Sequence, residues 1–168
     1  MFRLVPALLL ALALTAPARA ATFLLGEPPV VEITVPDSWG PAETRRGVDA
    51  TSPDGLMYMF AEIHPATPDA IDAAVTEAFD WASDNGMRFM GRPTPPETQP
   101  FNGWPRAVST MWSGVDQDGN DSLVSVTVVP LDARAALVIL AWGSNGGEQV
   151  HVETLRRIAG SVRPAPRR

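Results

Sequence analysis

Residues 135–142, which read Ala-Ala-Leu-Val-Ile-Leu-Ala-Trp, decide the fold of this chain. Side chains alternate between the two faces of a strand, so Leu137 and Ile139 point to one face while Val138 and Leu140 point to the other. Both faces are apolar, and a strand of this kind must be covered on both sides. The stretch therefore predicts a central strand in a sheet that carries a layer of structure on each face.

Residues 56–64 have the same character, with Tyr58 and Phe60 on one face and Met57 and Met59 on the other. Short turns rich in Asp, Asn, Gly and Pro separate the strand-like runs, which predicts antiparallel neighbours. Six strands are expected, over residues 30–35, 44–51, 56–64, 107–115, 122–129 and 135–142.

Two segments have helical periodicity. The first covers residues 68–84, where Thr67 can cap the N-terminus, Pro68 suits the first position and Gly86 can end the helix. The second covers residues 147–161. Its apolar face is expected to comprise Val152, Leu155, Ala159 and Val162, with Ile158 beside them. The sequence thus predicts an α+β fold in which an antiparallel sheet of about six strands packs with two main helices.

Several short motifs follow one another in the order seen in a known group of proteins. They are Val-Pro-Asp-Ser-Trp-Gly at 35–40, Ser-Pro-Asp-Gly at 52–55, Asn-Gly-Trp-Pro at 102–105, Asp-Gly-Asn at 118–120 and Gly-Ser-Val-Arg at 160–163. In element order and hydropathy, residues 28–163 resemble the Mog1/PsbP-like group of small α/β/α sandwich domains, including its exported bacterial members. The resemblance implies a binding or assembly-accessory domain, and the group has no shared catalytic residues to carry over.

The first 20 residues are typical of a cleaved secretory signal peptide. Arg3 provides the positive end, residues 4–14 form the apolar run, and Ala-Arg-Ala ending at Ala20 is a cleavage motif. The run is about half the roughly 20 residues that a membrane-spanning helix needs. We expect cleavage between Ala20 and Ala21, one globular domain over residues 21–168 without a transmembrane segment, and a periplasmic or secreted location.

Composition narrows the functions further. The chain has no cysteine, which excludes disulfides and a lipid anchor on cysteine. Its formal net charge is −6, and an acidic surface repels phosphate backbones, so we expect no nucleic-acid partner.

The candidates for chemistry are few. Residues 116–121 hold three carboxylates, but the twelfth position of a calcium loop starting there falls on Thr127, so the spacing predicts a hairpin turn. Glu62 and His64 share a strand face, where a carboxylate can orient an imidazole for general-base or metal chemistry. Neither a nucleophile elbow nor a phosphate-binding motif is present. We expect no catalytic residue, metal or cofactor.

Residues 92–106 combine five prolines with two aromatic residues between flanking arginines. Aromatic residues and arginine are typical anchors of protein interfaces, which makes Phe101, Trp104 and Arg106 the predicted partner contacts. In the alternative interpretation the segment only crosses the sheet, and Phe101 and Trp104 fill the core.

These observations favour a non-enzymatic binding or assembly-accessory protein with a partner in the envelope. One alternative is a small-molecule or lipid binder with a pocket between a helix and the sheet, lined by Met57, Met59, Trp81 or Trp112. Another is a hydrolase that uses Glu62 and His64. The sequence leaves the partner and the oligomeric state open.

Overall fold

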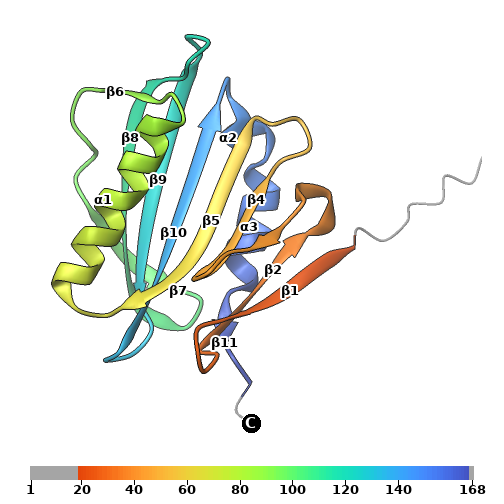
Figure 1. The fold of residues 1–168 in the computed structure, drawn as a ribbon, viewed down its shortest axis with the longest axis vertical. Helices are drawn as coiled ribbons and strands as arrows, with labels where there is room; N and C mark the ends of the chain where they lie inside the picture. Colours follow the sequence, from red (N-terminus) through yellow and green to blue (C-terminus); the bar gives the residue numbers. More distant parts are fainter. Residues whose placement is uncertain (1–18, 167–168) are drawn as a thin grey trace, which may run out of the picture.

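The computed structural model describes residues 19–166, which form eleven strands, three α-helices and a short 3-10 helix in two sheets (Figure 1). The strands are β1 Ala20–Leu25, β2 Val31–Pro36, β3 Ala42–Glu43, β4 Gly47–Thr51, β5 Met57–Pro65, β6 Arg88–Met90, β7 Glu97–Phe101, β8 Trp104–Val115, β9 Asp121–Pro130, β10 Ala135–Ser144 and β11 Arg163–Pro164. The helices are α1 Pro68–Asp84, α2 Gly147–Val150 and α3 Val152–Ser161, and the 3-10 helix is Asp37–Trp39.

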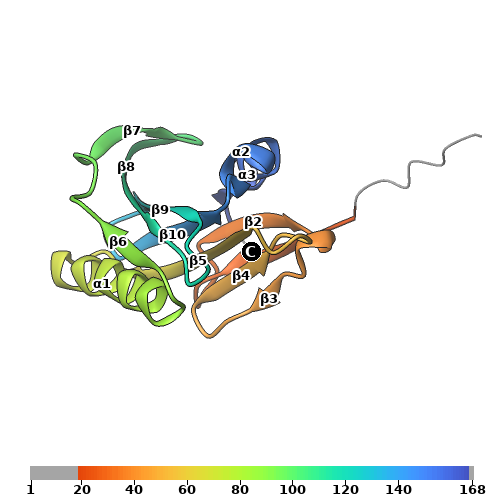
Figure 2. The ribbon, with the colours of Figure 1, turned by 90° about the horizontal axis from the view of Figure 1, so that it is seen from above.

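The large sheet has eight antiparallel strands in the order β3-β4-β5-β10-β9-β8-β6, with β7 also paired to β8. A small sheet has the order β1-β2-β11. Seen end-on, α1 covers one face of the large sheet, while α3 and the small sheet lie over the other (Figure 2). The α+β class is confirmed.

The prediction that the central strand is covered on both faces is confirmed. On β10, Leu137 and Ile139 belong to a core shared with α3 and the small sheet, whereas Val138 and Leu140 belong to a second core beneath α1. The same division holds on β5, where Met57 and Met59 face the first core and Tyr58 and Phe60 face the second.

Helix α1 begins and ends where the sequence predicts. The Thr67 Oγ1 atom accepts a hydrogen bond from the Ala70 N–H at 3.3 Å, Pro68 occupies the first turn, and Gly86 has a φ of +96°. The buried side of the helix consists of alanines, at positions 74, 78 and 82. Their small size lets the helix lie close to the sheet.

The expected number of strands was too low. The additional strands are short and lie at sheet edges, and β6, β7 and β11 contain charged residues or proline instead of an apolar alternation. Such strands form because a longer neighbour offers free backbone groups, which is a tertiary effect that local patterns do not contain.

The second helix was predicted in one piece and is in fact two. His151 has φ −102° and ψ 8°, which ends α2 before α3 starts at Val152. Ile158 and Val162 enter the core, but Val152, expected on the apolar face, is exposed. It precedes Ile158 by six residues, which places it about 120° away around the helix.

Most of the predicted signal peptide, residues 1–18, lies outside the described residues. Within residues 19–166 no helix is both long and apolar enough to cross a membrane.

Candidate functional site

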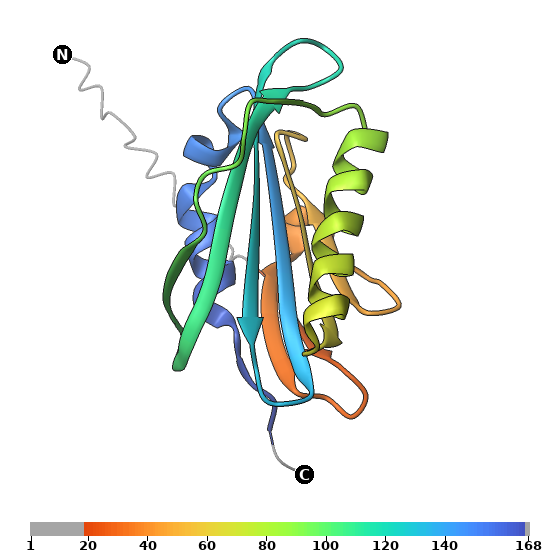
Figure 3. The same cartoon turned by 90° about the vertical axis from the view of Figure 1, so that its left-hand side faces the viewer.

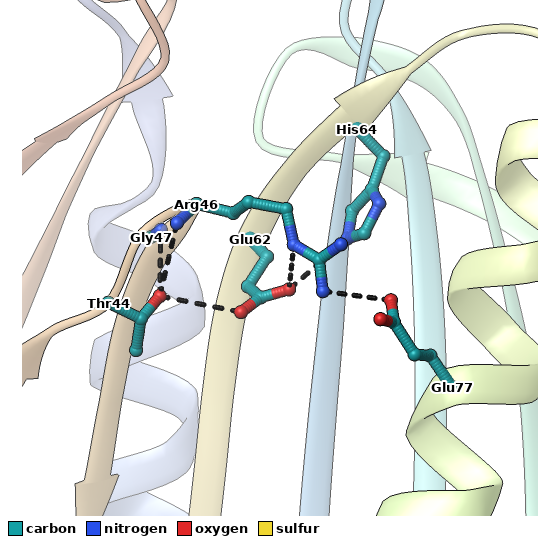
Figure 4. A network of polar contacts seen from close by, with 6 residues as sticks. All are labelled: Thr44, Arg46, Gly47, Glu62, His64 and Glu77. Carbon is teal, nitrogen blue, oxygen red and sulfur yellow. Dashed lines mark hydrogen bonds and ion pairs between the residues drawn. The ribbon is translucent and has the colours of Figure 1, made fainter.

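Glu62 and His64 lie side by side on β5, as the strand alternation predicts (Figure 4). The Nε2 atom of His64 is 3.3 Å from Oε2 of Glu62, and the histidine side chain is only 7% exposed. The pair therefore exists, and its chemistry depends on the groups around the carboxylate.

Arg46 and Thr44 reach the same carboxylate from the turn before β4. The Arg46 Nε atom donates to Glu62 Oε2 at 3.0 Å, and its Nη2 atom donates to Glu77 of α1 at 2.8 Å (Figure 4). The Thr44 hydroxyl donates to Glu62 Oε1 at 3.4 Å. Arg46 thus connects the edge of the large sheet to α1.

This network does not favour catalysis. The hydrogen bond from His64, together with Arg46, lowers the pKa of Glu62, so this carboxylate is a poor general base. The candidate base of the pair is the imidazole of His64, and that side chain is buried. A cleft of about 270 Å³ adjoins the network and is lined by Glu62 and Tyr58 but not by His64. Burial, followed by the charge of Asp49, raises the pKa of Tyr58. The arrangement is a polar network that joins α1 to the large sheet.

A second polar cluster was not foreseen. Asp54, in the turn before β5, accepts hydrogen bonds from Ser52 Oγ at 2.6 Å and from His151 Nε2 at 2.8 Å. His151 also packs against the Trp39 ring at 5.4 Å. The serine contacts the aspartate and not the histidine, so this is no nucleophilic triad. Asp54 and His151 are 97 residues apart in the chain, and the sequence indicated only the turn at 52–55.

The acidic segment 116–121 is the predicted turn between β8 and β9. Asp116 is buried and its Oδ1 atom accepts the N–H groups of Asp118 and Asn120, both at 2.9 Å. The carboxylate is occupied in holding the turn together, which lowers its pKa.

The proline-rich segment forms most of a hairpin instead of a loop. Strand β7 pairs with β8, and Asn102-Gly103 makes the tight turn with φ values of +45° and +91°. Trp104 is 9% exposed within the first core, and Phe101 packs against that core. These two side chains lie as the core-filling interpretation expects, whereas Arg106 is exposed.

The hairpin tip is fastened to the end of α3. The Asn102 side-chain amide donates hydrogen bonds to the carbonyls of Ala159 and Val162, the latter at 3.2 Å. Carbonyls at a helix C-terminus lack partners within the helix, so the hairpin satisfies groups that α3 leaves free.

The α3 side of the large sheet is flanked by α3 and by the β7–β8 hairpin, which curls toward the helix (Figures 2 and 3). The name trough is used here for the apolar cavity beneath α3 together with the adjoining surface of β8 and β9 on that face. Its deepest part is a cavity of about 190 Å³ beneath α3. The lining side chains are Ile33, Met59, Phe101, Ser125, Thr127, Ile139, Ala141, Leu155, Ile158 and Ala159. None of the cavity's lining residues is charged, so it suits an apolar group.

The four residues predicted to line one ligand pocket are divided between the two faces. Met57 and Met59 belong to the core on the α3 side, while Trp81 and Trp112 belong to the core beneath α1. Only Met59 lines the cavity in the trough. The sequence did not show which strand face each helix would cover.

No protein-family model matches the sequence, and no curated protein matches it. Among solved structures, LpqN from Mycobacterium tuberculosis, involved in cell envelope biogenesis, is 16% identical; the match covers 90% of this chain and 87% of LpqN with a TM-score of 0.48. The Ran-binding protein Mog1p from Saccharomyces cerevisiae is 11% identical, with 87% and 95% of the two chains covered and a TM-score of 0.48.

The cyanobacterial PsbP (CyanoP) from Synechocystis is 12% identical, with 90% of this chain and 95% of that chain covered. Its TM-score of 0.51 indicates a shared fold, while the low identity does not carry any activity across. The resemblance inferred from element order is therefore confirmed for the architecture, and the chain has the PsbP-like α/β/α sandwich fold.

Proposed function

We propose that this chain is an exported, non-enzymatic accessory protein that binds another component of the cell envelope through the trough. The observation that carries the proposal is the apolar lining of the trough next to solvent-exposed apolar side chains. Met111, on the β8 strand of its floor, is 40% exposed. Large apolar side chains that line a concave surface are typical of binding sites.

The state of the polar clusters supports binding over catalysis. The carboxylates of Glu62 and Asp54 each accept hydrogen bonds from two or more side chains, and the pKa of each is lowered by them. Groups engaged in this way stabilise the fold and have little capacity left to accept a substrate proton.

Export is part of the proposal and rests on the first 20 residues. Strand β1 pairs with β2 from Ala20 onward, with Ala21 opposite Val35. Cleavage between Ala20 and Ala21 would remove one end residue and leave the other five pairs of this ladder intact.

In-cell photo-cross-linking tests the proposal. A photoreactive residue at position 111 reports on the trough, and one at the exposed position 80 of α1 is the control on the opposite face. We expect a discrete envelope component, identified by mass spectrometry, to be captured from position 111 and not from position 80.

Equal capture from both positions, or none from either, would contradict the proposal. Arg106→Ala tests the third predicted contact, an exposed residue that does not line the cavity. Loss of capture in this variant at an unchanged melting temperature would move the contact surface to the start of β8, around Arg106.

A further inference from the structure

The chemical nature of what the trough binds can be argued from its size, its hydrogen bonds and the charge at its open end. This inference rests on the function proposed above and names the class of ligand. The lining of the cavity beneath α3 includes three buried side chains, those of Ile33, Met59 and Ile158. On one side of the cavity, Asn102 fastens the hairpin tip to the end of α3.

The apolar surface continues from the cavity toward the opposite end. Residues directly opposite each other in an antiparallel pair share a face. Ala141 is opposite Ser125, and Ser125 is opposite Met111, so Met111 lies on the cavity face. One strand further, Met90 is opposite Ser113 on the same face and is 60% exposed. This path from Ala141 to Met90 is about 16 Å long at ordinary strand spacings.

A thin occupant fits the cavity better than a helix. An α-helix with its side chains is about 10–12 Å wide, whereas the cavity is a small space of about 190 Å³ between α3 and the sheet. Methionine side chains adapt to flexible apolar groups, which suits a chain of variable conformation along the trough.

Residues 92–96 and the β8 edge beside them offer an extended peptide few hydrogen-bond partners. The neighbouring edge of β8 is already in use, because Thr94 N–H donates to Met111 O at 2.9 Å and Met111 N–H donates to Thr94 Oγ1 at 3.0 Å. The prolines at 93, 95, 96 and 100 have no N–H to offer. On the floor, the hydroxyls of Ser109 and Thr127 bond to each other at 2.9 Å. A hydrocarbon chain needs no such partners, whereas buried peptide groups do.

A cation stands at the open end. Arg88 lies two residues before Met90 on β6, hence on the same face, and it is exposed. Within residues 19–166 it forms no ion pair. We propose that the trough holds the acyl chain of an envelope lipid, with the chain in the cavity beneath α3 and an anionic headgroup beside Arg88.

Titration of the delipidated protein with dansyl-labelled undecanoic acid, followed by fluorescence, tests this assignment. We expect saturable binding of one probe per protein, displaced by unlabelled fatty acid. Ala141→Phe fills the cavity and should weaken binding by about tenfold or more. The matched control Ala73→Phe, on the exposed side of α1, should leave binding unchanged.

Two further variants test the binding of the probe in case Ala141→Phe does not fold. Met111→Glu places a charge on the exposed part of the path and should also weaken binding by about tenfold. Arg88→Gln should weaken binding of the anionic probe but not of an uncharged dansyl-labelled alcohol. Arg134→Gln, in the turn between β9 and β10, is its control.

Absence of saturable binding, or equal binding by all variants, would overturn the acyl-chain assignment. If position 111 still captures an envelope protein in cells while the probe does not bind, the binding function stands and only the ligand class fails. If both experiments are negative, the proposed function fails as well. Native mass spectrometry of protein taken from the envelope fraction should show a bound lipid mass, lost in Met111→Glu.

Discussion

At the scale of single residues, several carboxylates of this domain each accept hydrogen bonds from more than one group. Asp54 and Glu62 hold segments together that are far apart in the chain, since their partners include His151 and Arg46 respectively. A chain without cysteine has no disulfides to restrict its unfolded state, so contacts of this kind contribute to holding its elements in place.

Asp54 makes stability depend on pH in the acid range. Hydrogen bonds from Ser52 and then His151 lower its pKa from 3.8 to about 2 in the folded protein. Because the pKa is lowered, the charged carboxylate stabilises the folded protein at pH values above 3.8. This contribution to stability disappears as the pH falls from 3.8 toward 2. Asp54→Asn should therefore be less stable than the native protein near neutral pH.

Urea unfolding over a pH series measures this effect. The difference in midpoint between the native protein and Asp54→Asn should be constant above about pH 5 and shrink on acidification. A difference that grows as the pH falls would contradict the assignment of the lowered pKa to Asp54.

Glu62 and Glu77 both pair with Arg46, but they differ in exposure. The Glu62 side chain is 16% exposed and the Glu77 side chain is 60% exposed. Glu62→Gln should lower the free energy of unfolding by about 1–3 kcal/mol, because it removes the charge that Arg46 and His64 both face. The matched change Glu77→Gln should cost no more than about 0.5 kcal/mol.

Chemical denaturation of the two variants checks this prediction. Equal losses would show that burial does not determine the value of the Arg46 contacts. Binding of the dansyl probe serves as the control measurement, since neither residue lines the trough and both variants should bind normally.

At the scale of elements, the β7–β8 hairpin connects features that the sequence showed separately. Its tip places Trp104 in the core and Asn102 against α3. Trp104→Ala should cost about 3–5 kcal/mol because it removes a large core side chain, so loss of partner capture in that variant would reflect unfolding as much as lost contacts.

Asn102 offers a cleaner test of the connection between hairpin and helix. Asn102→Gly keeps a residue that tolerates its φ of +45° but removes the amide. We expect a loss of about 1 kcal/mol in the free energy of unfolding and faster hydrogen exchange in β7 and the last turn of α3. Unchanged exchange in both segments would show that the amide does not hold them together.

The elements that the sequence predicted well are those determined by their own residues. Helix α1 has its N-cap, its first-turn proline and its terminal glycine in or next to the segment itself. Strand β10 has two apolar faces, which indicates burial on both sides. The hairpin escaped prediction because Pro100 lies within β7, and Pro95 and Pro96 directly precede it. Proline normally argues against a strand, whereas an edge strand tolerates it.

The candidate sites were harder to predict for the same physical reason. Strand alternation was enough to place Glu62 beside His64, but Arg46 and Glu77 join them only through the packing of α1 against the sheet. The trough depends on how far β7 curls toward α3, which no local pattern contains (Figure 2).

At the scale of the whole molecule, the large sheet is shared by two cores. The core on the α3 side includes residues from the small sheet and the C-terminal helix, and the other consists of α1 and the opposite sheet face. Strand β10 contributes to both, so we expect one cooperative unfolding transition rather than two.

The N-terminus of the exported protein is the remaining prediction at this scale. If the first 20 residues are a signal peptide, the chain isolated from the periplasm should begin at Ala21, and intact mass spectrometry determines this directly. A shortened chain that starts at Phe23 is the comparison for a chain that starts at Ala21. It lacks the β1 residues Ala21 and Thr22, which pair with β2, so it should be less stable. A full-length mass in the periplasmic fraction would contradict cleavage at this position.

The hydrogen bonds between Asn102 and the end of α3 have a consequence for how a ligand would enter and leave the trough. Because the hairpin tip is joined to the helix on that side, an acyl chain bound as proposed would enter and leave from the other side, beside β6. The molecule that delivers the lipid and the molecule that receives it would then bind the same end of the trough, one after the other.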